Sequence, residues 1–306
     1  MIVLVTGGTG FVGREIVHEL HAAGHDLRLL VRHRMSPAAQ EIASRYAAEV
    51  REGNVRDAAS LPGALDGADA VIHRVGIISE VGGQTFENVH TRGTENMIAS
   101  ARRAGVKRFL HMSALGTRPN AVSRYHQTKW AAEQSVSQSE LDWTIFRPSL
   151  IYGPQDHFVN WFARLAESSP VLPVMGEGRA LFQPVAVQDV ARCFARALSE
   201  PASVRETFDV CGPDKLTLPE MLRAILAATG RKRLIARVPI QQARAVAAFL
   251  EFFFPRVLRK APPLNRDQLV MLQENNVGEP GWAVEMFGLR QNSFTEGIAR
   301  YLKRQT

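Results

Sequence analysis

Cysteine is scarce in this sequence, with only two among 306 residues. Two cysteines cannot build a disulfide framework, and Cys193 and Cys211 both lie among apolar residues, where a buried reduced thiol is the ordinary state. The sequence also lacks the run of about 18 uncharged apolar residues that a transmembrane helix needs. Its first residues lack the charged segment of a secretory signal. We therefore expect a cytoplasmic protein without a membrane-spanning helix.

Internal repeats and low-complexity segments are also missing. A content of 45% apolar and 22% charged residues, with 23 glycines and 16 prolines, excludes a collagen-like or mostly disordered chain. The net charge of +7 favours anionic ligands, such as a phosphate-bearing cofactor or an acidic membrane surface. His18, His21 and His25 have helical spacing, but no carboxylate or cysteine stands in ligand register with them, so we expect a helix surface and no metal ion. The sequence shows no nucleic-acid-binding module, so we expect no nucleic acid to bind.

Short apolar runs alternate with helical patterns over the first 150 residues. The apolar runs lie at 2–6, 27–31, 70–73, 109–112 and 144–147. The helical patterns lie at 12–23, 86–104 and 124–137. This alternation predicts an α/β fold with right-handed crossovers and a doubly wound parallel sheet. We expect residues 1–150, completed by 184–210, to form one domain, and residues 151–183 and 211–306 to form a smaller, mostly helical substrate region.

A glycine-rich turn follows the first apolar run directly. Thr6-Gly7-Gly8-Thr9-Gly10-Phe11-Val12-Gly13 contains a Gly-x-Gly-x-x-Gly spacing and opens a helical pattern. Glycine lets the backbone approach a pyrophosphate, and the helix N-terminus supplies free N–H groups and the positive end of its dipole. The strand before the turn and the helix after it are the context that this motif requires. We therefore predict a Rossmann-type dinucleotide site with contacts from Gly7, Thr9, Gly10, Phe11, Val12 and Gly13.

The end of the second apolar run bears on which dinucleotide binds. Sites that prefer NAD usually place an acid there for the ribose 2′-hydroxyl, whereas NADP sites use arginine for the 2′-phosphate. This run ends in Arg32-His33-Arg34 without an acid, and arginine suits bidentate phosphate contact. We predict that Arg32 and Arg34 favour NADP(H). The alternative is that both arginines are solvated and the cofactor is NAD(H).

Tyr125 and Lys129 form a Tyr-x-x-x-Lys pair at the start of a helical pattern. A four-residue spacing puts both side chains on one helix face. A nearby ammonium favours tyrosinate, so we expect the pKa of Tyr125 to lie below its ordinary value of about 10. Tyr125 is then a candidate acid or base toward a hydroxyl or carbonyl. Lys129 is its candidate partner and a candidate ligand of the nicotinamide ribose.

Further segments extend the pattern over residues 1–200. They are Asn88-Val89-x-x-x-Gly93-Thr94-x-Asn96, Gly105-Val106-Lys107-Arg108-Phe109, Arg147-Pro148-Ser149-x-Ile151-Tyr152-Gly153-Pro154 and Val187-Gln188-Asp189-Val190-Ala191. With the glycine turn and the Tyr-x-x-x-Lys pair, the chain resembles a short-chain dehydrogenase/reductase of the extended or atypical kind. The stretch Leu264-Asn265-Arg266-Asp267-Gln268-Leu269 is similar to a narrower group, the bacterial relatives of the large nucleotide-binding accessory subunit of respiratory complex I.

The resemblance implies a third catalytic residue, a serine or threonine after the fifth strand. Ser113 is the hydroxyl residue there, but many relatives use the next position, which is Ala114 in this chain. The resemblance also places four residues along the cofactor: Asn54, Val75, Gly76 and Pro148. Asn54 stands where the family usually has an acid that contacts adenine, and an amide oxygen can still accept a hydrogen bond.

Two functions follow from these residues. The first is an NADP(H)-dependent oxidoreductase acting on a carbonyl or hydroxyl of a hydrophobic small molecule. Sugar-nucleotide relatives place a phosphate-binding arginine where this chain has Phe182, which argues against such a substrate, although Arg179 is near enough to substitute. An apolar stripe at 158, 161, 162 and 165 suits either core or an apolar pocket. The second function is a non-catalytic NAD(P)H-binding structural or assembly subunit of a respiratory or quinone-related system.

Residues 240–260 combine phenylalanines with basic residues. A helix over 240–254 would be about 22 Å long, which is too short to span a bilayer. Bulky apolar and basic residues together suit a helix that lies on anionic lipid. We therefore expect either peripheral contact with the inner face of the membrane or a helix packed on the protein core with solvated ends.

Overall fold

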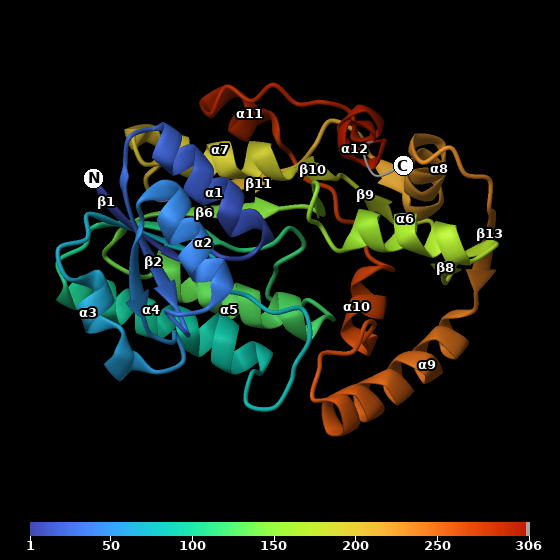
Figure 1. Ribbon diagram of the computed structural model, residues 1–306, viewed down its shortest axis with the longest axis horizontal. Helices are drawn as coiled ribbons and strands as arrows, with labels where there is room; N and C mark the ends of the chain where they lie inside the picture. Colours follow the sequence, from blue (N-terminus) through green and yellow to red (C-terminus); the bar gives the residue numbers. More distant parts are fainter. Residues whose placement is uncertain (304–306) are drawn as a thin grey trace.

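A parallel sheet of seven strands organises the computed structural model, which describes residues 1–303 (Figure 1). The strand order is β3-β2-β1-β4-β5-β6-β11, and every pairing between neighbours is parallel. The strands are β1 (Ile2–Thr6), β2 (Asp26–Val31), β3 (Glu49–Glu52), β4 (Ala70–His73), β5 (Arg108–Met112), β6 (Asp142–Pro148) and β11 (Glu206–Val210). The doubly wound fold predicted from the sequence is confirmed.

Helices cover both faces of this sheet because alternate strand residues point to opposite sides. Val3 and Val5 join the core on one face, and Leu4 joins the core on the other. The first face is covered by α1 (Phe11–Ala22), α2 (Pro37–Tyr46), α7 (Val187–Ala197) and α11 (Gly281–Met286). The second face is covered by α3 (Pro62–Leu65), α4 (Arg92–Arg103) and α5 (Arg124–Ser137).

The expected helix over 86–104 is divided in the structure. A π-helical turn, η2 (Glu87–Thr91), precedes α4. Two short 3₁₀ turns, η1 (Ala58–Ser60) and η3 (Pro201–Ser203), complete the connections around the sheet. The division at Thr91 matters for the site because it places the buried side chain of His90 directly before α4.

The C-terminal region has its own core, which lies beyond the carboxyl ends of the sheet strands (Figure 1). Its strands pair in twos: β7 (Ile151–Tyr152) with β10 (Val185–Ala186), β8 (Val171–Met175) with β13 (Leu234–Val238), and β9 (Leu181–Phe182) with β12 (Leu216–Thr217). Its helical elements are α6 (Phe158–Ser168), α8 (Leu218–Ala228), α9 (Ile240–Phe253), η4 (Phe254–Leu258), α10 (Arg266–Met271) and α12 (Phe294–Leu302).

The stripe on α6 packs into this second core rather than lining an open pocket along its whole length. Phe162 is buried there, and Phe158 and Leu165 pack against the same cluster. Trp161 is exposed. Within residues 1–303, no helix combines the length and the apolar character needed to cross a bilayer.

Hydrogen bonds join the two regions at the carboxyl edge of the sheet. The Ser149 hydroxyl lies just after β6 and donates to the Asn276 carbonyl at 3.1 Å. The Asn276 side-chain amide donates to the Leu115 carbonyl, just after β5, at 3.0 Å. The C-terminal segment is therefore fixed beside the loops where ligands bind in open α/β sheets.

Candidate active site

The glycine turn lies between β1 and α1, at the carboxyl edge of the sheet. Gly7 has a φ of +69°, a conformation that residues with a Cβ rarely adopt. A Cβ on Gly13 would lie 2.3 Å from the Gly7 carbonyl oxygen, so the helix approaches the turn closely only because residue 13 is glycine. Gly10, the N-cap of α1, has no side chain to bond the first N–H groups of the helix. These groups suit the pyrophosphate of a dinucleotide.

The other residues predicted along the cofactor surround this turn. Val12 is buried in the core, and the ring of Phe11 lies 3.2 Å from where a Cβ on Gly153 would stand. The Thr9 carbonyl accepts a hydrogen bond from Arg14 Nε at 3.2 Å. The Pro148 carbonyl accepts from the Leu115 N–H at 2.9 Å. These contacts hold the turn and the end of β6 in place.

Arg74, directly after β4, fills the space beneath the glycine turn. Its guanidinium donates from Nη1 to the Gly7 carbonyl, and the same nitrogen lies 2.7 Å from where a Cβ on Gly13 would stand. Its Nε is inaccessible to solvent and has no hydrogen-bond partner among the described residues. Loss of hydration lowers the pKa of Arg74 to about 10, and no carboxylate within residues 1–303 pairs with it. A cation is thus held at the turn without an anion from the protein.

Arg74 was not predicted as a site residue from the sequence. The next two residues, Val75 and Gly76, were predicted from the resemblance alone. A charged residue directly after a buried apolar strand was the available signal. The diphosphate of a dinucleotide would supply the anion that the structure does not provide for Arg74.

The predicted adenosine end of the site carries three arginines. Arg32 Nη1 donates to the side-chain oxygen of Gln84 at 3.2 Å, and Arg56 Nη1 donates to the Gly83 carbonyl at 2.8 Å. Both bonds tie the loop at 80–85 to this end of the site. Arg34 is exposed, and its backbone N–H donates to a carboxylate oxygen of Glu52 at 3.1 Å. The end of β2 has no acidic residue of its own, but Glu52 of β3 lies beside it, because Glu52 pairs with Val31 across the sheet.

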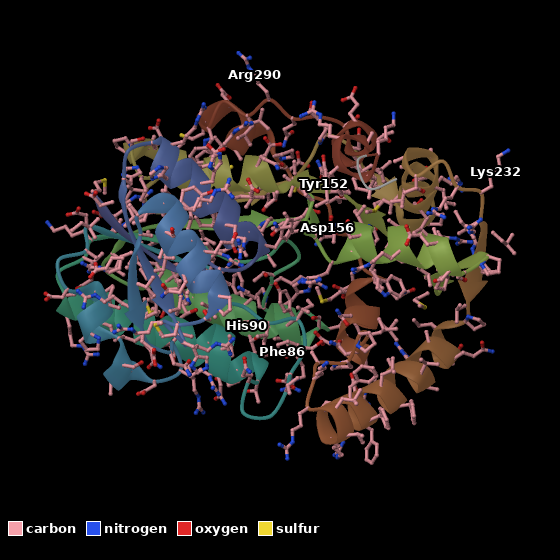
Figure 2. All side chains as sticks on the ribbon, in the orientation of Figure 1. Phe86, His90, Tyr152, Asp156, Lys232 and Arg290 are labelled. Carbon is pink, nitrogen blue, oxygen red and sulfur yellow. The ribbon has the colours of Figure 1, made fainter. Side chains whose placement is uncertain are left out.

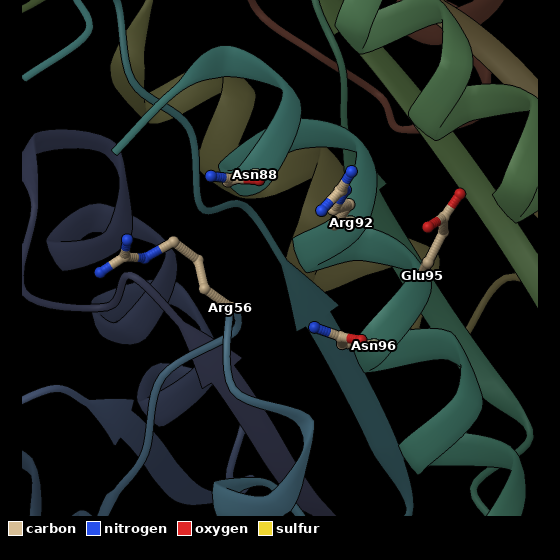
Figure 3. Close-up of a pocket in the computed structure, with 5 residues that line it drawn as sticks. All are labelled: Arg56, Asn88, Arg92, Glu95 and Asn96. Carbon is tan, nitrogen blue, oxygen red and sulfur yellow. The ribbon is translucent and has the colours of Figure 1, made fainter. Parts of the chain in front are cut away.

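Asn54 shapes the turn after β3. Its side-chain oxygen accepts a hydrogen bond from the Arg56 N–H at 3.1 Å, which leaves the second lone pair of that oxygen for a ligand. Beside it, a polar hollow of about 480 Å³ opens between this turn and the helix formed by η2 and α4 (Figure 3). The hollow is lined by Arg56, Asn88, Arg92, Glu95 and Asn96.

Lys129 is held at the centre of the site. It is 2% exposed, and its Nζ donates to the Met112 carbonyl at the end of β5 at 2.8 Å. The same Nζ lies 3.4 Å from where a Cβ on Gly76 would stand, so the structure brings these two predicted residues together. Burial, with repulsion from Arg74, lowers the pKa of Lys129 to about 8. Two cations therefore occupy the region predicted to bind the cofactor.

Tyr125 lies one turn before Lys129 on α5, but its pKa does not follow the expectation. Burial raises the pKa of Tyr125 to about 12, so the expected lowering by the ammonium is wrong for this state of the protein. The ring makes edge contacts with His90, at 5.1 Å between centroids, and with Phe86, at 6.0 Å. Figure 2 labels these two neighbours, which lie side by side before α4. The phenol loses hydration to these rings, and Lys129 is engaged with a carbonyl.

Ser113 follows β5 and is 1% exposed. Its hydroxyl lies 3.5 Å from the Thr117 hydroxyl, and its backbone N–H donates to the Phe146 carbonyl at 2.8 Å. Ala114, the neighbouring position that many relatives use, is partly exposed. The structure thus pairs Ser113 with a second hydroxyl, Thr117, that sequence analysis did not consider.

Three buried histidines surround Lys129. His73 lies 3.0 Å from the Thr6 hydroxyl and 3.1 Å from the Thr94 hydroxyl. His90 Nε2 accepts the Ile77 N–H at 3.1 Å, so its Nδ1 carries the proton that faces the Thr128 hydroxyl at 2.9 Å.

The ring of His111 stacks on the ring of His73 at 5.7 Å, and neither of its nitrogens has a partner among the described residues. Burial and the charge of Lys129 lower the pKa of His73 to about 3 and that of His90 to about 2. All three rings are therefore neutral at pH 7, since the pKa of His111 is also lowered by burial.

Asp267, on α10, reaches the N-terminus of the helix that carries Tyr125. One carboxylate oxygen accepts from the Ser123 hydroxyl at 2.7 Å and from the Tyr125 N–H at 3.1 Å. The other accepts from the Arg124 N–H at 2.7 Å. A negative charge at this position satisfies free N–H groups and complements the helix dipole. Asp267 belongs to the stretch that carries the narrower family resemblance, but no role was predicted for it from the sequence.

A family model described as the NAD dependent epimerase/dehydratase family matches residues 3–211, which include the whole glycine turn, Tyr125 and Lys129. The chain belongs to this family. It is therefore an NAD(P)-binding Rossmann protein of oxidoreductase type, as the resemblance predicted.

Relatives of this chain carry names that indicate different functions. Ceramide reductase of Caulobacter vibrioides is 31% identical over 240 residues, covering 78% of this chain and 74% of the relative. NADH dehydrogenase (ubiquinone) 1 alpha subcomplex subunit 9, mitochondrial, of Arabidopsis thaliana is 28% identical, covering 90% of this chain and 69% of the relative. NAD(P)H azoreductase of Xenophilus azovorans is 26% identical, covering 79% of each chain. The narrower resemblance to the respiratory accessory subunit is thus confirmed as a similarity.

Solved structures agree with the fold. An NADPH-dependent quinone oxidoreductase from Escherichia coli, solved with NADPH, has a TM-score of 0.76 at 18% identity and covers 97% of this chain and 99% of its own. A dTDP-glucose 4,6-dehydratase from Streptomyces venezuelae, solved with NAD, has a TM-score of 0.76 at 21% identity and covers 100% of this chain and 98% of its own. At these identities the likeness concerns the fold alone.

Proposed function

We propose that this protein is an NADP(H)-dependent reductase or dehydrogenase that acts on a carbonyl or hydroxyl of a hydrophobic small molecule. The observation that carries the proposal is the position of Lys129, which lies on the same helix as Tyr125. Its Nζ is held between the end of β5 and Gly76. The pair stands at the predicted nicotinamide end of the nucleotide site. The bound nicotinamide would supply or accept the hydride.

Three residues of this chain would carry the remaining steps of the reaction. Tyr125 would donate or accept the proton of the substrate oxygen. Lys129, charged below a pH of about 8, would lower the cost of the tyrosinate and hydrogen-bond the cofactor ribose. Ser113, with Thr117 behind it, is the proposed hydroxyl that polarises the carbonyl.

We favour an apolar substrate over a sugar diphosphate, because within residues 1–303 an apolar side chain stands where sugar-nucleotide relatives bind the phosphate. Phe182 is buried at the position where sugar-nucleotide relatives place that arginine. Arg179, the proposed substitute, is exposed and pairs with Glu177 at 3.1 Å. The name of one relative, a ceramide reductase, supports a hydrophobic carbonyl substrate.

Preference for NADP(H) over NAD(H) is part of the proposal and rests on the arginines of the adenosine end. Arg32 and Arg34 follow β2, and Arg56 lies across from them after β3. A 2′-phosphate would meet guanidinium groups there. The carboxylate of Glu52 would repel a 2′-phosphate, and we propose that attraction by the arginines is the larger effect.

The test is oxidation of NADPH against a panel of hydrophobic ketones, aldehydes and quinones. We expect at least one compound to be reduced. Tyr125→Phe should lower turnover by about a hundredfold or more while the Kd for NADPH stays within about twofold of wild type. Tyr46→Phe, on α2, is the matched control and should behave as wild type. Equal turnover by the wild type and Tyr125→Phe would refute the role of Tyr125.

A non-catalytic subunit that binds NAD(P)H is the second candidate. One observation favours it: the pKa of Tyr125 is raised to about 12, and the side chain that should lower it donates to a carbonyl. The similarity to a respiratory accessory subunit supports the same function. Purified protein that retains NADPH, gains thermal stability from it and reduces no compound of the panel would favour this candidate over the enzyme.

A further inference from the structure

Bulky apolar side chains project from the outer side of α9 and η4. Phe249 is 63% exposed and Phe252 is 59% exposed. Exposed apolar residues on the same segment, here called the α9 surface, are Val246, Phe249, Phe252, Phe253, Val257 and Leu258. Figure 1 shows α9 at the periphery of the molecule, away from the Rossmann sheet.

The opposite side of α9 is packed, so the exposure of the α9 surface does not come from a detached helix. Ala243 and Ala247 are buried one turn apart and form a small core with Leu269 of α10. Glu251 pairs with Arg266, at the start of α10, at 2.6 Å. The helix is therefore fixed on its inner side with its phenylalanines facing outward.

The charges around the α9 surface are of one sign. Arg244, Arg256, Arg259 and Lys260 are all exposed, and within residues 1–303 no carboxylate forms an ion pair with them. Arg256 lies over the ring of Phe252, 4.3 Å from its centroid. The acid of the helix, Glu251, is already neutralised by Arg266. A partner for this surface must therefore combine apolar groups with negative charge.

We propose that the α9 surface docks on a bilayer that contains anionic phospholipid. With 14 residues α9 is about 21 Å long, which suits a helix lying in the interface with its phenylalanines among the acyl chains. The basic residues would face the phosphate headgroups. A second copy of the chain fits less well, because a symmetric contact would bring the same four cations together on both sides.

The α9 surface is joined to the candidate active site through α10. Arg266 holds Glu251 of α9, and the adjacent Asp267 holds the N-terminus of the helix that carries Tyr125. Exposed apolar residues continue toward the site at Ile78, whose carbonyl accepts from Asn265, and at Val122 beside Ser123. Docking would thus bring the N-terminus of α5, the helix that carries Tyr125, toward the lipid. This last consequence, unlike the docking itself, rests on the proposed function.

The experiment measures sedimentation of the purified full-length protein with vesicles. We expect binding to vesicles of phosphatidylcholine mixed with phosphatidylglycerol, weaker binding to phosphatidylcholine alone, and weakening as salt is added. The double variant Phe249→Ser with Phe252→Ser should bind at least about tenfold more weakly. Arg256→Gln with Lys260→Gln should lose the preference for the anionic lipid. Far-UV circular dichroism and thermal unfolding report that each variant is folded.

Two matched controls lie elsewhere on the surface. Trp161→Ser removes an exposed aromatic ring from α6, and Arg290→Gln removes an exposed cation at the opposite side of the molecule (Figure 2). Both should bind vesicles as wild type does. The proposal is overturned if the wild type does not sediment with anionic vesicles, or if the α9 variants bind as tightly as the controls. It is also overturned if the phenylalanine variant only converts a dimer to a monomer. None of these readouts depends on turnover, so failure of the proposed function would leave them unchanged.

Discussion

The carboxylate of Asp267 accepts a hydrogen bond from the hydroxyl of Ser123 at 2.7 Å, across 144 residues of sequence. Ser123 is the N-cap of α5, so this bond fixes the first turn of the helix that carries Tyr125 and Lys129. The same carboxylate accepts the backbone N–H groups of Arg124 and Tyr125. The C-terminal region thus does more than cover the site, because it sets the orientation of the proposed catalytic helix.

Asp267→Asn should therefore act on turnover through position. An amide keeps one acceptor oxygen and loses the charge, so we expect kcat to fall about tenfold with the Kd for NADPH unchanged. The free energy of unfolding should fall by about 1 kcal/mol, because the first N–H groups of α5 lose a negatively charged acceptor. The measurements are steady-state kinetics, cofactor titration and denaturant unfolding.

Asp57→Ala is the control for this substitution. Asp57 caps the short turn η1 by accepting the Ala59 N–H at 3.2 Å, and its carboxylate makes no hydrogen bond to α5 within residues 1–303. Because alanine removes the capping oxygen, this substitution should cost comparable stability, about 1 kcal/mol, without changing kcat. If Asp267→Asn likewise leaves kcat unchanged, the role of Asp267 is limited to stabilising the fold.

The parts of the site that the sequence predicted are those encoded locally. The glycine turn is read from consecutive residues, and a Cβ on Gly13 would stand only 2.3 Å from the Gly7 carbonyl, which explains why the spacing is strict. The sheet was predicted because buried parallel strands are continuous apolar runs. Tyr125 and Lys129 were placed on one face by helical spacing alone.

The parts that the sequence did not reveal depend on distant neighbours. The role of Asp267 appears only when α10 packs on α5, and the pKa of Tyr125 rises because Phe86 and His90 close around it. Glu52 reaches the end of β2 through strand pairing, which no local pattern records. The short helix α2 was missed because only two of its residues, Ala39 and Ile42, are buried.

Arg74→Met should weaken both dinucleotides equally. If the half-buried Arg74 guanidinium binds the diphosphate, its loss removes one charge-assisted contact that NAD and NADP share, and we expect each Kd to rise about 10- to 100-fold. The protein without cofactor should keep or gain stability, because a poorly hydrated cation without an anionic partner is replaced by an apolar side chain. Calorimetric titration and thermal unfolding without cofactor measure the two effects.

The outcome that would contradict this role of Arg74 is a variant that is destabilised without cofactor yet binds both dinucleotides as tightly as wild type. Arg74 would then serve only to hold the Gly7 carbonyl. Arg290→Met, at an exposed position, is the control for general loss of a positive charge.

Arg32→Ala should separate the two cofactors. The 2′-phosphate is the group that distinguishes NADPH from NADH, so loss of the guanidinium should raise the Kd for NADPH about tenfold or more and leave the Kd for NADH nearly unchanged. Glu52→Gln should act in the opposite sense and tighten NADPH, because it removes a negative charge beside Arg34. Equal affinities of the wild type for both cofactors, unchanged in both variants, would remove the basis for NADP preference.

The free energy of unfolding should depend on pH through Lys129. Burial lowers its pKa from 10.5 to about 8 in the folded chain, so between these values the unfolded chain binds more protons than the folded chain. The free energy of unfolding therefore rises with pH over this window, and the contribution of Lys129 is constant below and above it. Relative to Lys129→Met, the wild type should gain up to about 3 kcal/mol between pH 8 and pH 10.5.

Urea unfolding without cofactor, repeated across this window, measures the difference between the wild type and Lys129→Met. Taking the difference cancels the other groups that titrate at high pH. Lys107→Met, at an exposed position before β5, is the matched control, and its difference from the wild type should not follow the same rise. A flat difference for Lys129→Met would mean that water or an anion already stabilises the ammonium in solution. Added NADPH should also flatten the curve, because its phosphates would bring the pKa of Lys129 back toward its ordinary value.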